Sequence, residues 1–267
     1  MDSRPLILLS NDDGIEAEGL RVLARKLRRV ADLLVVAPDS ERSATSHAVQ
    51  ISGRWRYERR GHDEYAVDGT PADCVYVAVT QFAPRRPDLV LSGINNGFNL
   101  GTDVLYSGTV AAAAEGVVLG IPGIALSADR DADPDTVERA ARFGAALASW
   151  VLESGWSPVW TLLNVNVPVG CLDNRFALGA MGTRVYRPAP RQHSDWPGQG
   201  TLSLTRPGAS ATHGAKGEDA EILEAGMISV SPLRLDWTAR DQLDLGERMA
   251  LDGFESGRRA GDHGERG

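Results

Sequence analysis

Two adjacent carboxylates stand near the N-terminus of the chain, directly after an apolar run. Asp12 and Asp13 follow Leu6-Ile7-Leu8-Leu9, a pattern typical of a strand buried on both faces of a parallel sheet. Ligands bind at the carboxyl edge of such sheets, and two neighbouring aspartates there would repel each other unless a divalent cation neutralised them. The alternative is an Asp-Asp-Gly turn that only closes the strand.

Two later loops carry oxygen ligands of the same kind. Ser43 lies in the polar loop 39–47 after an apolar stretch at 32–38, and Asn95 lies in the loop 93–101 after another at 88–92. If the strands are parallel, both loops share the sheet edge of Asp12 and Asp13. Oxygen ligands from Asp, Ser and Asn favour Mg²⁺, Mn²⁺ or Ca²⁺ over zinc. The pattern predicts a divalent-metal site, although Ser-rich loops are more often simple turns.

A third feature is a helix start that could hold an anion. Ser107, Gly108 and Thr109 precede an alanine-rich stretch at 110–119. Free N–H groups at a helix N-terminus, with two hydroxyls beside them, suit a phosphate. The alternative is that Ser107 is only the N-cap of this helix. His47 could donate a proton to a leaving group, but a role in the surface loop is the favoured interpretation.

The order of the expected elements indicates an α/β fold. We predict a Rossmann-like, mostly parallel sheet flanked by helices, with an antiparallel hairpin at 48–67 that projects from the sheet. A helix start at Thr70-Pro71-Ala72-Asp73 has the sequence of a capped N-terminus. Strands are expected at 6–9, 32–38, 88–92, 123–127 and 161–167, with helices at 20–27, from 70 onward, at 110–119 and from 133 to about 152.

The character of the chain changes beyond residue 170. We expect a Rossmann-like catalytic core at 1–170 and a C-terminal extension or arm at 171–251 that completes the fold and contacts another subunit. The extension contains one short expected strand at 228–233 and an amphipathic helix at 240–251. Residues 252–267 are rich in glycine and mixed in charge, which predicts a disordered tail.

Composition excludes several functional classes. The chain has 267 residues and a net charge of −8, so a nucleic-acid polymer is not expected as a partner. Its 2 cysteines lie far apart and form no zinc motif. The N-terminus of this sequence shows no basic segment followed by an apolar run with a small-residue cleavage site, and no apolar run reaches about 18 residues, so we expect a cytoplasmic protein without membrane contact. It also lacks G-x-G-x-x-G, P-loop and G-x-S-x-G motifs.

Five ordered blocks together resemble the SurE family of survival-protein nucleotidases. They read S-N-D-D-G-I at 10–15, A-P-D-S-E-R-S-A-T-S-H at 37–47, G-T-P-A-D-C-V at 69–75, S-G-I-N-N-G-F-N-L-G at 92–101 and Y-S-G-T-V-A-A-A-A-E-G at 106–116. The later segment G-M-I-S-V-S-P-L at 226–233 resembles the family as well, so the likeness covers nearly the whole chain.

The resemblance implies a 5′- and 3′-nucleotidase that uses one divalent ion, Mg²⁺ or Mn²⁺, with Ca²⁺ an alternative in crystals. Its substrates would be nucleoside monophosphates, with short polyphosphate as a further candidate, and a C-terminal arm would build a homodimer or homotetramer. Phe98 stands where the family commonly has proline, a change that bears on the stiffness of that loop and removes no ligand. Segment 190–217 matches the family weakly, which leaves the base preference open. The family's metal ligands map onto Asp12, Asp13, Ser43 and Asn95, and its phosphate contacts onto Asn99, Ser107, Gly108 and Thr109, with Asn11 in the first block.

The mechanism we expect is hydrolysis of a phosphomonoester by water, in which one of Asp12 and Asp13 orients or deprotonates the water and the other binds the metal. A second hypothesis is a phospho-aspartate intermediate on Asp12. Adjacent aspartates argue against it, because haloacid-dehalogenase-type phosphatases place theirs one residue apart. A third is a non-catalytic oligomer that senses metabolites by binding metal and nucleotide. The two carboxylates weigh against this sensor, because a pure phosphate binder would use Lys or Arg.

Overall fold

The computed structural model describes residues 4–50, 52–171, 175–184 and 215–242. The chain divides into two compact units, Met1–Leu235 and Asp236–Gly267. In the second unit, the described residues contain a short 3-10 turn at Arg240–Gln242 and an ion pair between Asp236 and Arg240. All elements discussed below belong to the first unit.

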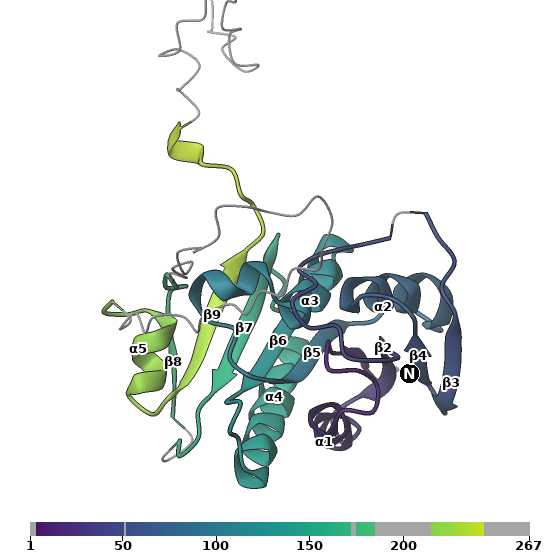
Figure 1. Ribbon diagram of the computed structural model, residues 1–267, viewed down its shortest axis with the longest axis horizontal. Coiled ribbons are helices and arrows are strands. Elements are labelled where there is room, and N and C mark those ends of the chain that lie inside the picture. Colours follow the sequence, from purple (N-terminus) through teal and green to yellow (C-terminus); the bar gives the residue numbers. More distant parts are fainter. Residues whose placement is uncertain (1–3, 51, 172–174, 185–214, 243–267) are drawn as a thin grey trace, which may run out of the picture. The chain divides into compact units, whose positions relative to one another are not determined.

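The first unit is built on a single nine-stranded sheet, in the order β3-β4-β2-β1-β5-β6-β7-β9-β8. The strands from β4 to β7 run parallel to one another, while β3 and β9 are antiparallel to their neighbours β4 and β7 (Figure 1). Their bounds are β1 Leu6–Ser10, β2 Asp32–Pro38, β3 Tyr57–Gly61, β4 Glu64–Val67, β5 Leu89–Asn96, β6 Gly123–Ala128, β7 Thr161–Val167, β8 Phe176–Leu178 and β9 Ile228–Arg234.

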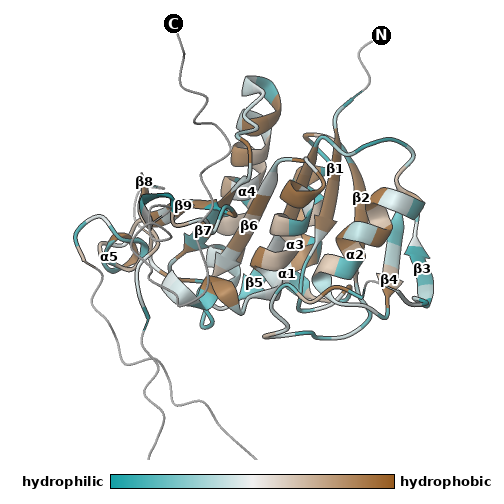
Figure 2. Ribbon diagram, turned by 90° about the horizontal axis from the view of Figure 1, so that it is seen from above, coloured by the Kyte–Doolittle hydropathy of each residue, from teal (hydrophilic) through white to brown (hydrophobic). Residues whose placement is uncertain are grey.

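Helices cover both faces of this sheet (Figure 2). Helices α1 (Glu18–Leu27) and α4 (Pro134–Ser154) pack on each other and on one face, while α2 (Pro71–Val77) and α3 (Gly108–Val118) pack on the other. A π-helical turn, Ala78–Phe82, continues α2, a 3-10 turn, Gly101–Leu105, precedes α3, and α5 (Asp219–Glu224) lies against β9. Since both faces are covered, every residue of β1 is buried, which explains its unbroken apolar sequence.

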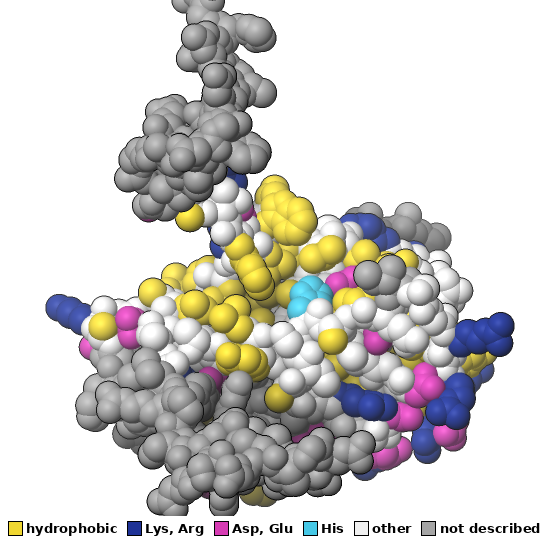
Figure 3. Space-filling model, turned by 45° about the horizontal axis from the view of Figure 1, so that its top comes forward, with side chains coloured by type: hydrophobic (Ala, Val, Ile, Leu, Met, Phe, Trp, Pro, Cys, Tyr) yellow, Lys and Arg dark blue, Asp and Glu magenta, His cyan; other side chains and the backbone are white. Residues whose placement is uncertain are grey.

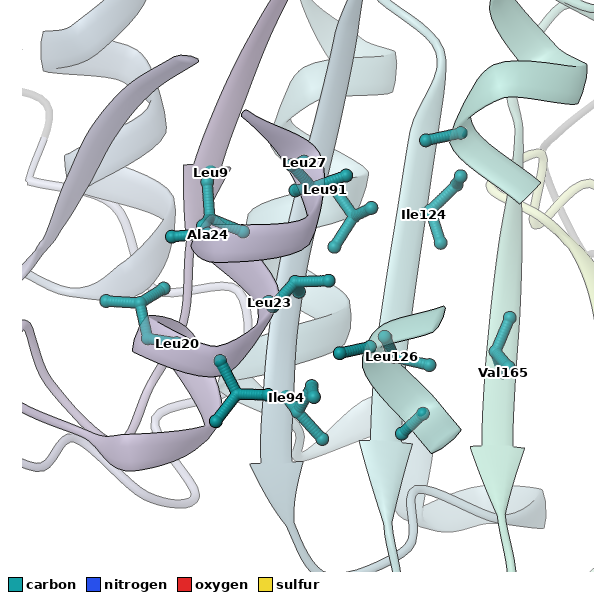
Figure 4. Packing of buried hydrophobic residues seen from close by; sticks show 14 of the residues in the cluster. Leu9, Leu20, Leu23, Ala24, Leu27, Leu91, Ile94, Ile124, Leu126 and Val165 are labelled. Atoms are coloured by element: carbon teal, nitrogen blue, oxygen red, sulfur yellow. The ribbon is translucent and has the colours of Figure 1, made fainter. Parts of the chain in front are cut away.

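The larger core lies between the sheet and the α1–α4 layer. Figure 4 shows Leu20, Leu23 and Leu27 of α1 directed at side chains of the central strands, among them Leu91. Each of these leucines is almost fully buried, which contributes about 1.5–3 kcal/mol per side chain. The helical spacing of these residues in the sequence therefore matches the face of α1 that packs on the sheet.

The predicted helix caps are present. The Thr70 hydroxyl accepts a hydrogen bond from the Asp73 N–H at 3.1 Å, and the Asp73 carboxylate accepts one from the Thr70 N–H at 3.0 Å, which is a capping box. Asp133 caps α4 by accepting from the Thr136 N–H at 2.8 Å. Both helices start where the sequence places them, and this fixes the loops that precede them at the sheet edge.

The predicted hairpin is present but lies differently from our expectation. We expected it to project from the sheet, whereas β4 pairs parallel with β2, so the hairpin extends the sheet by two strands. Residues 48–50 and 52–55 of the expected hairpin precede β3 and form no strand. The side chains of β3 are mostly exposed, and Figure 3 shows acidic and basic side chains interspersed at this end of the molecule. A charged edge strand of this kind resists pairing with other chains.

Two further segments differ from the sequence-based boundaries. Strand β5 continues through Asn96, with a register shift between Ser92 and Asn95, where the sequence predicts a loop from residue 93. The strand expected at 228–233 is β9, which lies within the main sheet between β7 and β8. Of the helix expected at 240–251, only the 3-10 turn at its start is described. The expected tail at 252–267, and most of segment 190–217, lie outside the described residues.

Candidate active site

The turn after β1 is shaped by Asn11. Its side-chain nitrogen donates to the Gly14 carbonyl at 2.9 Å, and its side-chain oxygen accepts from the Gly14 N–H at 3.2 Å. Gly14 has a φ of +96°, a conformation that side chains rarely adopt. Because both polar atoms of the Asn11 side chain are engaged within the turn, Asn11 holds the two aspartates in place, and its contact with phosphate stays a prediction.

Asp12 and Asp13 contact different elements on the two sides of this turn. Asp12 is 5% exposed, and its Oδ1 accepts a hydrogen bond of 2.5 Å from the Thr109 hydroxyl on α3. Asp13 is half-buried and accepts from the Asn96 N–H on β5 at 3.2 Å. A Cβ on Gly108 would lie 2.8 Å from the Cβ of Asp12, so only glycine lets the start of α3 come this close.

Burial raises the pKa of both carboxyl groups. The pKa of Asp12 rises to about 6, since burial and the charge of Asp13 outweigh the hydrogen bond from Thr109. Burial also raises the pKa of Asp13, against the hydrogen bond from Asn96. Within the described part of the chain, neither aspartate forms an ion pair with Lys or Arg. These are two desolvated carboxylates without a compensating side-chain charge, and such a donor set fits a divalent cation.

Asn95 is available as a third oxygen donor. Its side-chain nitrogen donates to the Gly97 carbonyl at 2.6 Å, which fixes the orientation of the amide. Its amide oxygen accepts no hydrogen bond from the described residues. Asn95 and Asp13 line the same cavity of about 370 Å³. Among the described residues, no group of three or more His, Cys, Asp or Glu side chains could hold a metal, so the two aspartates are not joined by a third such ligand there.

The loop that carries Ser43 is joined to the aspartate turn through the backbone. The Arg42 N–H donates to the Asp12 carbonyl at 2.8 Å. The Ser43 side chain is exposed, and its hydroxyl donates to Glu41 at 2.7 Å rather than to either aspartate. Ala44 and Ser46 have φ values of 57° and 55°, so this loop is held in a conformation that non-glycine residues rarely adopt. The structure therefore brings the loop to the site, while Ser43 as a metal ligand stays a prediction.

Ser107 is the N-cap of α3. Its hydroxyl accepts a hydrogen bond from the Val110 N–H at 3.1 Å, which confirms the capping interpretation. The cap leaves the first N–H groups of the helix, at Gly108 and Thr109, beside Asp12. The positive end of α3 thus lies next to Asp12 of the aspartate pair. This arrangement suits an anion that contacts both the helix start and a cation held by the aspartates.

Asn99 belongs to a buried polar network that the sequence analysis did not find. Its side-chain nitrogen donates to the Ser127 hydroxyl at 2.8 Å, and its carbonyl accepts from Asn164 and Asn166 of β7. Its N–H donates to Asn166 at 2.8 Å. Asp219, which is fully buried, accepts from the Gly101 N–H at 2.8 Å. The signal for this network was present in the sequence, since two asparagines alternate with apolar residues in 161–167.

His47 pairs with a buried acid. Its Nε2 lies 2.8 Å from the Glu115 carboxylate, and the Glu115 side chain on α3 is 8% exposed. Two further bonds, from the N–H and the hydroxyl of Ser46 to the Tyr106 and Leu105 carbonyls, join the same loop to the segment before α3. This geometry supports a role for His47 in holding the loop to α3, which was the favoured interpretation.

Comparison with known proteins identifies the family. The family model described as Survival protein SurE matches residues 7–194. The chain belongs to the SurE family. It is 45% identical to the 5′-nucleotidase SurE of Sorangium cellulosum over 263 residues, which cover 93% of this chain and 97% of that protein. It is also 45% identical to the 5′-nucleotidase SurE of Gemmatimonas aurantiaca, over 89% and 96% of the two chains.

The fold is that of the family as well. The crystal structure of the SurE protein from Aquifex aeolicus superposes with a TM-score of 0.78 at 35% identity, covering 90% of this chain and 98% of that one. The family resemblance and the α/β fold class predicted from the sequence are both confirmed. No helix in the described part of the chain is both long and apolar enough to cross a membrane.

The raised pKa of Asp12 predicts a stabilising substitution. In metal-free buffer at pH 7, Asp12→Asn removes a buried charge while it keeps an oxygen for Thr109. A rise in pKa from 3.8 to about 6 corresponds to up to about 3 kcal/mol, so we expect a higher melting temperature for Asp12→Asn in EDTA. The native state binds this proton more tightly than the unfolded state, so the stability of the metal-free wild type should fall as pH rises from about 4 to 6.

The control for this experiment is Asp131→Asn, which removes one negative charge from an exposed position. Its melting temperature in EDTA should stay close to that of the wild type. If the melting temperature of Asp12→Asn at pH 7 in EDTA were equal to or lower than that of the wild type, the buried carboxylate would not be a destabilising group.

The His47–Glu115 pair predicts a specific loss of stability. His47→Ala leaves the buried Glu115 carboxylate without its partner, so we expect the free energy of unfolding in urea to fall by about 1–3 kcal/mol. Glu115→Gln keeps a hydrogen bond to the imidazole and should cost less. His62→Ala is the control, because the His62 side chain is 87% exposed. Similar values for the His47 and His62 variants would contradict this role.

Proposed function

We infer that the protein is a metal-dependent nucleotidase that hydrolyses nucleoside 5′-monophosphates to nucleoside and phosphate. The observation that carries this inference is the contact of Asp12 with Thr109. It joins the aspartate turn at the end of β1 to the start of α3, which supports a cation site at the aspartates beside an anion site at the helix start. The names of relatives that are 45% identical over most of both chains support the same activity.

The donor set supports one divalent ion, which we propose to be Mg²⁺ or Mn²⁺, with Ca²⁺ as a substitute in crystals. Asp12, Asp13 and Asn95 would hold it, and Ser43 would join them after its hydroxyl turns from Glu41. When bound, such an ion offsets the charge on phosphoryl oxygens and acidifies water. The absence of a nearby Lys or Arg partner for the aspartates, among the described residues, supports a cation in this position.

The chain's own groups have separate tasks in this proposal. The N–H groups of Gly108 and Thr109, with the Ser107 hydroxyl, would bind phosphoryl oxygens at the positive end of α3. Asp13 is the better candidate for the base that takes a proton from the attacking water, because it is more exposed than Asp12 and free of the Thr109 hydroxyl. Asn11 and Asn99 would act by holding the two loops in place.

Several finer features belong to the same proposal. We expect 3′-monophosphates to be cleaved as well, short polyphosphate to be a further substrate, and the protein to act in the cytoplasm as a homodimer or homotetramer. The C-terminal extension at 171–251 would provide the subunit contacts. A net charge of −8 supports the expectation that nucleic-acid polymers are not partners.

The test is phosphate release from AMP, GMP and their 3′ counterparts. We expect release to stop in EDTA and to return with Mn²⁺ or Mg²⁺, because no Lys or Arg of the described residues pairs with the aspartates and the metal would supply that charge. Asp12→Asn and Asp13→Asn should each lower kcat by about 10²-fold or more at saturating metal, while Asp131→Asn should not change it.

Other outcomes identify the rival functions. Tight nucleotide binding without phosphate release under any metal would favour a sensor. Trapping of a phosphorylated Asp12 with a phosphate analogue would favour a phospho-aspartate enzyme. Full turnover by Asp12→Asn would contradict the proposed site itself.

A further inference from the structure

A cavity of about 370 Å³ opens directly beside the aspartate pair, on the side away from α3. Asp13 and Asn95 form part of its wall, and it continues between the starts of α1 and α4. Its volume is within the range of pockets that bind small molecules. Asp12 contacts the start of α3 while the neighbouring Asp13 lines this cavity, so the aspartate turn adjoins both the proposed phosphate site and the cavity.

The walls of this cavity suit an uncharged group better than a second phosphate. Ile94, Ala128 and Val137 provide an apolar surface. The charged groups in the lining are four carboxylates and one guanidinium, so a further anion would be repelled. A ligand with hydroxyl and amino donors can donate hydrogen bonds to the carboxylates, and a flat apolar ring can pack on the apolar side chains. The nucleoside part of a nucleotide has this chemistry.

Two residues of the loop after β6 can provide specific contacts. The turn at Gly97 is held to the last residue of β6 by a 2.9 Å hydrogen bond from its N–H to the Ala128 carbonyl. A Cβ on Gly97 would lie 3.5 Å from Nη2 of Arg130, so the guanidinium lies over the bare backbone of the turn. Arg130 forms no ion pair with the described residues. Asp129 is half-buried in the cavity wall next to it.

We propose that this cavity is the nucleoside subsite of the enzyme, with Asp129 accepting hydrogen bonds from ribose hydroxyls and Arg130 stacking on the base. Carboxylates recognise ribose hydroxyls in other nucleotide sites, and a planar guanidinium stacks on flat rings. The proposal rests on the proposed function, because it places the leaving group relative to the same aspartate pair. It makes Asp129 and Arg130 determinants of specificity rather than of the chemical step.

The test compares a nucleotide with a phosphomonoester that lacks a nucleoside. For Asp129→Asn and Arg130→Ala, we expect kcat/KM for AMP to fall by about 10- to 100-fold, mainly through KM, since each loses a contact made by a charged group. The kcat/KM for p-nitrophenyl phosphate should change by less than about 2-fold. Asp131→Asn is the matched control, because it removes the same charge from the same loop at an exposed position outside the cavity lining.

A binding measurement separates this proposal from the activity itself. Adenosine has no phosphate, so its binding can be measured by calorimetry in EDTA, and the two variants should weaken it about 10-fold or more, whereas Asp131→Asn should not. Equal losses with AMP and p-nitrophenyl phosphate would overturn the subsite, because they would assign these residues to phosphate. Unchanged adenosine binding would overturn it as well. A wild-type protein that binds adenosine in this variant-sensitive way but releases no phosphate would contradict only the proposed nucleotidase.

Discussion

The burial of two adjacent carboxylates, Asp12 against the start of α3 and Asp13 against β5, is the constraint on which the rest of the site depends. Burial makes the charge on each unfavourable and raises the pKa of both, to about 6 for Asp12. A buried pair of carboxylates without a basic partner among the described residues lowers the free energy of unfolding. The Thr109 hydroxyl, the Asn96 N–H and the dipole of α3 offset part of this cost, and a divalent cation would offset the remainder.

The fold allows the turn with Asp12 and Asp13 to lie against the start of α3. Strand β1 is an interior strand of the sheet with helices on both faces, so the turn that follows it leaves the sheet between two packed layers. Gly108 allows α3 to start against Asp12 without a Cβ between them. The buried asparagines of β7 and the carboxylate of Asp219 hold the loop after β5, and His47 with Glu115 holds the loop after β2. Rigid loops of this kind keep a site pre-organised.

Much of the fold follows from local sequence patterns. The parts of the fold that these patterns do not predict are determined by long-range contacts. The apolar stretches at 32–38 and 161–167 are strands with those bounds, and the caps at Thr70 and Asp133 start the helices that the sequence predicts. The hairpin lies in the sheet because β4 pairs with β2, a choice that no local pattern encodes. Residues that could bind a ligand were recognisable from their motifs, whereas the Asn99 network and the Glu115 partner of His47 depend on packing between distant segments. The same motifs place the chain in the SurE family.

Direct measurement of metal binding tests, without any substrate, whether the aspartate pair forms one cation site. Free Mn²⁺ can be followed by electron paramagnetic resonance as the ion is titrated into the metal-free protein. We expect one ion bound per chain, with affinity reduced at least about 10-fold in both Asp12→Asn and Asp13→Asn, and unchanged in Asp131→Asn. Equal Mn²⁺ binding by the wild type and the two aspartate variants would contradict this expectation.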